Sequence, residues 1–207
     1  MLEERRKLFT EFSQRNYTRW NTPFDLLETF IVICTEAGEE FNNSYRSTAV
    51  EENNLVFDIV VKHHARACHI SQEILCLLKS GFADGAHARW RALHEVNVTA
   101  MFIAKHGQDC AERFYRHEII ESYKGMRQHK ASEYRLNEKG PTQEELLEYK
   151  ASYDKLITKY RKTFGEPYGW ASNAIINKRV NFAEIEKDVL LDHMRPYYKW
   201  ASQNIHA

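Results

Sequence analysis

Apolar residues recur at helical spacing along almost the whole chain, and this periodicity constrains the fold more than any other feature. One run has members three, four or seven positions apart: Phe24, Leu27, Ile31, Cys34, Phe41 and Tyr45. Because only 8 glycines and 4 prolines occur in 207 residues, few positions break such helices. The sequence therefore predicts an all-α fold, a bundle of about seven to nine helices in a single domain over residues 1–207, with the helices of 1–50 as a peripheral extension.

A central pair of helices is marked by its capping residues. One helix is predicted from Asn54 to Ser80, and Asp84 caps another that stops at Gly107. Since the loop between them, Gly81 to Asp84, is short, the two helices should form an antiparallel hairpin.

Start and stop residues also mark the other helices. The most regular one begins at the capping box Thr142-x-x-Glu145 and reaches Gly165. Others are predicted over Leu2–Tyr17, from Thr22-Pro23 to Tyr45, from Gln108 into the 130s, from Asn181 to His193 and from Pro196 onward. Because the last helix has no capping signal at Ala207, we expect the natural chain to continue beyond it.

The charge balance and the termini bear on compartment and partners. Lys+Arg and Asp+Glu both number 29, so no global charge attracts a nucleic acid or an anionic membrane. The N-terminus lacks the apolar core of a secretory signal, and no apolar run approaches the roughly 18 residues of a membrane span. The four cysteines show no C-x-x-C spacing. These features predict a cytoplasmic protein with reduced thiols and no membrane contact.

Polar side chains gather on the predicted hairpin. Arg91, His94 and Glu95 lie at i, i+3 and i+4, so they share one surface. The preceding helix repeats this chemistry with Arg66, His69 and Glu73. The hairpin register predicts an ion pair between Glu73 and Arg91. A carboxylate can orient a guanidinium or an imidazole that titrates near neutral pH, so the cluster is either a brace or a working site.

Standard motifs of metal and nucleophilic chemistry are missing from the sequence. His64 and Cys68 have i, i+4 spacing, but no further ligands follow at recognisable positions, and there is no H-E-x-x-H. No Gly-rich phosphate loop and no G-x-S-x-G motif occurs. We therefore expect neither a metal nor a cofactor.

Three segments carry a first resemblance: Leu78–Glu95 with its core Arg91-Ala-Leu-His-Glu95, Tyr168-Gly-Trp-Ala171, and Tyr198–His206. They resemble an uncharacterised bacterial family of helical proteins, domain of unknown function 5677, over residues 55 to 207. The resemblance implies a helical fold and a chain that runs past the last segment. It implies no defined chemistry.

A second resemblance rests on Arg89-Trp-Arg-Ala-Leu-His94, in which four residues separate an Arg from a His. This spacing is similar to the motif of the HEPN ribonucleases, helical proteins of toxin–antitoxin and phage-defence systems. The sequence departs from that motif at Trp90 and lacks a Tyr two residues after the His. Arg89 also lies about 140° from His94 around the helix. The resemblance implies a homodimer in which both motifs line a cleft between protomers.

RNA cleavage suits these residue types. Attack by a 2′-hydroxyl needs a cation to stabilise the phosphorane and a group that moves a proton, which Arg and His supply without a metal. This hypothesis is a metal-independent ribonuclease acting as a toxin or phage-defence effector on RNA. Its catalytic residues are Arg89, Arg91, His94 and Glu95, and its supporting residues are Arg66, His69, Glu73, Arg113, His117, Trp170 and His206.

The alternative is a non-enzymatic helical sensor or protein-interaction module of a bacterial defence system, with a cognate protein partner. Several residues fit either hypothesis. Arg113 and His117 extend a cleft or lie on an exposed face over two core aromatics, and we favour the exposed face. Trp170 stacks on a base or closes a core at a turn, and we favour the second. His206 joins the cluster if the last helix packs back on the hairpin.

Overall fold

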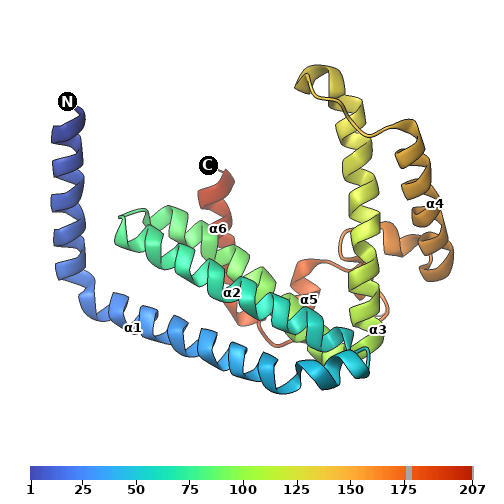
Figure 1. The fold of residues 1–207 in the computed structure, drawn as a ribbon, viewed down its shortest axis with the longest axis horizontal. Helices are drawn as coiled ribbons and strands as arrows, with labels where there is room; N and C mark the ends of the chain where they lie inside the picture. The colour runs from blue at the N-terminus through green and yellow to red at the C-terminus, as the bar shows by residue number, and fades with distance from the viewer. Residues whose placement is uncertain (176–178, 207) are drawn as a thin grey trace. The chain divides into compact units, whose positions relative to one another are not determined.

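The structure, a computed structural model, describes residues 1–175 and 179–206, and all of their side chains except those of Ile205 and His206. The described residues form six α-helices and three short 3₁₀ helices without any strand (Figure 1). The α-helices are α1 (Leu2–Glu51), α2 (Leu55–Lys79), α3 (Ala83–Leu136), α4 (Gln143–Tyr160), α5 (Phe182–Asp188) and α6 (Arg195–His206). The predicted all-α fold is confirmed. Within the described chain, no helix is long and apolar enough to cross a membrane.

Fewer α-helices form than the sequence predicted, because two pairs of predicted helices run together. In α1 the non-helical residue is Trp20 (φ −121°, ψ 19°), two positions before the predicted cap Thr22. Pro23 then falls in the first turn after the kink, where its missing N–H matters least. In α3 the predicted stop at Gly107 coincides with a break: the backbone there leaves helical geometry (φ 73°, ψ −158°), and a second helical stretch of α3 follows directly.

The chain divides into two compact units, which we describe separately. The first unit comprises residues 1–104 and 189–207, and the second comprises residues 105–188. The expected single domain stays a prediction.

The predicted hairpin of α2 and α3 lies in the first unit (Figure 1). Asn54 caps α2 by accepting a hydrogen bond from the Phe57 N–H at 3.0 Å. Gly81 has φ +83°, and a Cβ at this position would meet the ring of Phe12 at 2.5 Å. Because α3 begins at Ala83, Asp84 lies inside the first turn and does not cap the helix as predicted. A carboxylate in the first turn is still stabilised by the positive end of the helix dipole.

Helix α1 covers α2 along one stripe. Phe24 and Ile31 of α1 are buried with Leu75 of α2. Further along, Nε2 of His64 lies 2.8 Å from the carbonyl oxygen of Cys34. Gly38 makes room for that ring, because a Cβ there would lie 2.4 Å from it. The stripe therefore ties α1 to the hairpin by both apolar and polar contacts.

The second unit consists of the later part of α3 with α4 and α5. The predicted capping box is confirmed: Thr142 and Glu145 satisfy each other's backbone N–H groups at the start of α4. This helix ends at Tyr160, before the predicted Gly165, because Arg161 adopts φ 72°. Asn181 caps α5 as predicted, by accepting from the Glu184 N–H at 3.2 Å.

Candidate functional site

The centre of the polar cluster joins α3 to α6 in the first unit. Nε of Arg91 donates to Oε1 of Glu95 at 3.0 Å, and the Tyr198 hydroxyl donates to the same oxygen at 2.5 Å. The Arg91 guanidinium also lies over the Tyr198 ring, 4.8 Å from its centroid. One carboxylate oxygen therefore holds a cation and a phenol together.

These contacts fix the charges of the cluster. Burial raises the pKa of Tyr198, and the hydrogen bond to Glu95 raises it further, so the phenol remains a donor. Burial is the largest single effect and works against the charged form of Arg91, but the hydrogen bonds and charges of Glu95 and Tyr198 together outweigh it, so the pKa of Arg91 is raised. The guanidinium thus stays charged and is neutralised by its neighbour on the same helix.

A second ion pair connects α2 to α3, in a register that differs from the predicted one. Nε of Arg89 donates to Oε2 of Glu73, and Nε2 of His69 lies 3.1 Å from the other oxygen of Glu73. The hydrogen bond from Arg89 is the main reason that the pKa of Glu73 is lowered. The predicted pair of Glu73 with Arg91 is wrong, because the hairpin aligns residues two positions earlier on α3. Arg66, on the same helix as Glu73, is exposed.

His94 is buried within an aromatic stack, with only 6% of its surface exposed. Its ring lies 5.4 Å from the Trp90 ring at an interplanar angle of 13°, and 5.9 Å from the Tyr198 ring. The predicted surface shared by Arg91, His94 and Glu95 is thus divided. Arg91 and Glu95 pair at the α6 contact, while His94 turns its ring toward Trp90.

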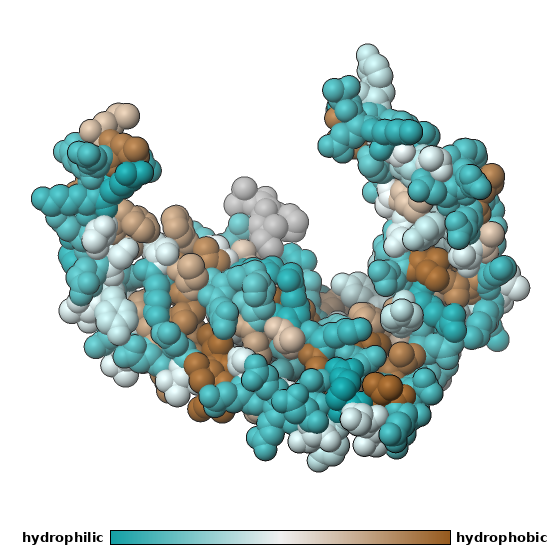
Figure 2. Space-filling view, in the orientation of Figure 1, coloured by the Kyte–Doolittle hydropathy of each residue, from teal (hydrophilic) through white to brown (hydrophobic). Residues whose placement is uncertain are grey.

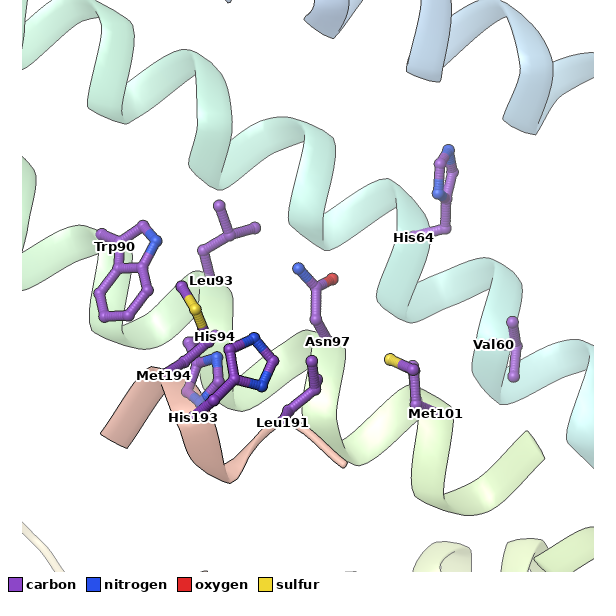
Figure 3. A pocket seen from close by; sticks show the side chains of 11 residues that line it. Val60, His64, Trp90, Leu93, His94, Asn97, Met101, Leu191, His193 and Met194 are labelled. Carbon is purple, nitrogen blue, oxygen red and sulfur yellow. The ribbon is translucent and has the colours of Figure 1, made fainter. Parts of the chain in front are cut away.

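A groove of 440 Å³ opens beside this stack in the first unit. Figure 3 shows its lining, which comes from α2, α3 and the turn before α6: Val60, His64, Trp90, Leu93, His94, Asn97, Ala100, Met101, Leu191, His193 and Met194. None of these residues is an Asp, Glu, Lys or Arg. The groove is therefore lined by apolar groups, three imidazoles and one amide.

Sequence reasoning missed part of this site. His193 and Met194 were not predicted as site residues, since their position depends on how the segment after residue 189 folds back on the hairpin. Trp90, Asn97 and Met101 are spaced so that they share one side of α3, and this is the side that lines the groove.

Arg113 belongs to a separate cluster in the second unit, where it holds a turn. Nε donates to the Trp170 carbonyl at 3.0 Å, and Nη2 donates to Oγ of Ser172 at 2.9 Å. Its guanidinium lies over the rings of Tyr160 and Phe164, at 4.6 and 5.3 Å. Burial lowers the pKa of Arg113.

His117 lies one turn further along the same buried face. Its Nε2 lies 3.2 Å from the Glu166 carbonyl oxygen, and its ring meets Phe164 edge-on at 5.2 Å. The exposed face that we favoured is wrong: Arg113 and His117 are each 7% exposed, whereas Tyr115 between them is 60% exposed. Helical spacing alone could not decide which side of this helix faces inward.

Trp170 closes the core of the second unit at a turn, as favoured from the sequence. It is 4% exposed and meets Phe114 edge-on at 5.0 Å.

The side chain of His206 lies outside the described residues. Among the described residues, no three His, Cys, Asp or Glu side chains are grouped so that they could hold a metal ion.

Comparison with known proteins assigns the family. No curated protein and no solved structure matches the chain. Residues 57–207 match a family of unknown function, DUF5677, so the match includes the hairpin, the groove and the cluster of the second unit, and leaves α1 outside. Since the match spans most of the sequence, the chain belongs to the DUF5677 family of unknown function.

Proposed function

We propose that this chain is a non-enzymatic helical module, a sensor or protein-interaction domain, in which the polar cluster of the hairpin is a brace. The observation that carries this proposal is the pairing of both candidate cations. Arg91 is held by Glu95 and Arg89 by Glu73, within the same chain. A guanidinium engaged in this way is not available to bind a scissile phosphate unless its ion pair opens.

The position of His94 supports the same conclusion. A general acid or base must come within hydrogen-bonding distance of the proton that it moves. The His94 ring lines the groove but is only 6% exposed, because it lies between the rings of Trp90 and Tyr198, so little of it can reach a ribose hydroxyl. The ribonuclease of HEPN type is therefore the competing proposal, and it requires this cluster to rearrange.

The groove beside the stack is the recognition site of the proposed module. Small-molecule sites are mostly apolar, enclose about 300–1,000 Å³ and contain a few polar groups that orient the ligand. The groove has this size and lining, with Asn97 as donor and acceptor and Trp90 as an aromatic wall. Because its lining carries no acidic side chain, Lys or Arg, an uncharged, planar ligand fits it best.

An RNA cleavage assay separates the two proposals. The purified chain and its His94→Ala variant are incubated with a mixed RNA pool between pH 5.5 and 8.5, without added metal. We expect both proteins to leave the pool uncut. Cleavage by the wild type that His94→Ala abolishes overturns the non-enzymatic proposal and supports the ribonuclease.

Adenine and indole probe the groove directly, because both are planar and uncharged. We expect at least one of them to shift the NMR signals of Trp90 and Met101, and Ala100→Trp to abolish these shifts by filling the groove. Lys62→Trp is the matched control, since Lys62 is an exposed α2 residue outside the groove lining. If neither probe shifts the signals, the groove does not recognise this class of ligand.

A further inference from the structure

We propose that α1 is a self-association surface. In this arrangement the basic segment 2–19 of one copy packs on the acidic, apolar part of α1 in a second copy, and the contact is reciprocal. The inference does not depend on the proposed function, because it uses residues outside the groove and outside the hairpin cluster.

Helix α1 carries a second apolar stripe besides the one that covers α2. The second stripe is solvent-exposed and has helical spacing: Leu26 (71% exposed), Phe30 (62%) and Ile33 (56%). The buried residues Phe24 and Ile31 point to the other side, onto α2. Figure 2 shows hydrophobic side chains among the polar ones along α1. An apolar surface of this extent on a folded chain marks an interaction site.

The charges of α1 are divided between its two ends. Residues 2–19 carry five basic and three acidic side chains, whereas residues 21–51 carry six acidic side chains and one basic. Glu36 and Glu40 lie along the side of the exposed stripe, at positions that follow Ile33 by one turn and two turns. The stripe therefore requires a partner that is both apolar and basic.

Segment 2–19 of a second copy has this chemistry. Leu2, Leu8 and Phe9 are 60%, 60% and 50% exposed, and Arg5, Arg6 and Lys7 flank them. A second copy thus covers both exposed surfaces at once, since each α1 offers one basic and one acidic surface. An anionic membrane or a nucleic acid would cover only the basic segment and leave the apolar stripe exposed.

The fold already holds segment 2–19 in place at one end. Nδ2 of Asn16 donates to the carbonyls of Leu78 and Lys79 at 3.0 Å each, and the Phe12 ring lies against Gly81. These contacts anchor the segment to the turn of the hairpin, while residues 2–9 remain exposed. Because the segment is ordered before association, less conformational entropy is lost when a partner binds.

Sedimentation velocity of the full chain tests the stripe. We expect a dimer for the wild type and the monomer mass for Phe30→Asp/Ile33→Asp. Leu147→Asp is the control, because Leu147 is similarly exposed (57%) but lies on α4, outside α1, and this variant should remain dimeric. Circular dichroism confirms that each variant is helical. A monomeric wild type, or a double variant that stays dimeric, overturns the proposal.

Charge reversal identifies the occupant. We expect monomers from Arg5→Glu/Arg6→Glu/Lys7→Glu and also from Glu36→Lys/Glu39→Lys/Glu40→Lys. An equimolar mixture of the two triple variants should form dimers again, because each then supplies the charge that the other needs. A mixture that stays monomeric contradicts reciprocal packing. Binding of a monomeric wild type to anionic phospholipid vesicles would instead assign segment 2–19 to a membrane surface.

Discussion

Helix α3 contains two arginine–histidine pairs, one in each unit, and the protein uses them differently. In the first unit Arg91 is neutralised by the carboxylate of Glu95. In the second unit Arg113 is held by backbone carbonyls, a serine hydroxyl and two aromatic rings. The spacing of Arg to His is similar in both, three residues in one and four in the other.

This difference shows that the partner of a buried cation decides its role. A carboxylate on the adjacent turn satisfies Arg91 locally, so the pair can join α3 to α6 through Tyr198 without organising a loop. Carbonyls far along the chain satisfy Arg113, so this residue fixes the turn from Gly169 to Ser172. Loss of Arg113 should therefore be costlier than loss of Arg91.

The largest effect is expected for Arg113→Met. The substitution removes the donors that satisfy the Trp170 carbonyl and the Ser172 hydroxyl in a buried place, and a methionine replaces only the stem. Losses of buried, hydrogen-bonded charged groups amount to about 3 kcal/mol in the free energy of unfolding. Urea unfolding monitored by tryptophan fluorescence measures the change.

Arg116→Met is the control for this substitution. Arg116 lies three residues further on α3 and pairs with Glu112 at 2.8 Å, but its side chain is 45% exposed. Exposed pairs of this kind contribute about 0.5 kcal/mol. Equal losses for the two variants would mean that Arg113 does not hold the turn.

A smaller effect is expected for the brace of the first unit. Tyr198→Phe removes one charge-assisted hydrogen bond to Glu95 and should lower the free energy of unfolding by about 1 kcal/mol. Arg91→Met should cost about 1–2 kcal/mol, since Glu95 is then left with Tyr198 and solvent. The double variant measures the coupling, which we expect to be at least about 0.5 kcal/mol because the three groups are in contact. Strictly additive losses would show that Arg91 and Tyr198 act independently.

Local signals accounted for most of what was predicted from the sequence. Capping chemistry identified the start of α4 at Thr142 and that of α5 at Asn181, because such contacts join residues three apart. The hairpin followed from the short loop after α2. The ends of α4 and α5 were misplaced because the chain turns at Arg161 and Leu190, which adopt positive φ. Positive φ is usually marked by a glycine in the sequence, and neither position has one.

Long-range packing accounted for what was missed. The register of the hairpin differs by two residues, and a shift of this size exchanges Arg91 for Arg89 opposite Glu73. The Arg113 side chain points inward because it binds the turn around Trp170, more than fifty residues away in the sequence. Helical periodicity carries no information about such a distant contact. Both errors affected the candidate site, since a site combines elements that are distant in sequence.

The smallest of these effects concerns His117 and the pH dependence of stability. Burial lowers the pKa of His117 in the folded chain, against the hydrogen bond to the Glu166 carbonyl and the charge of Glu121, which raise it. In the unfolded chain the imidazole has its ordinary pKa of about 6.5. As the pH falls through that value the unfolded chain takes up the proton first, so the free energy of unfolding decreases toward acid pH.

His117→Gln removes this titration and keeps a donor for the Glu166 carbonyl. Between pH 7.5 and pH 5 we expect the wild type to lose more stability than the variant, as measured by urea unfolding at each pH. His63 of the first unit also has a pKa lowered by burial, so part of the slope should survive His117→Gln and decrease further when His63→Gln is added. If the slope is unchanged in His117→Gln, burial beside Phe164 does not shift the pKa of His117.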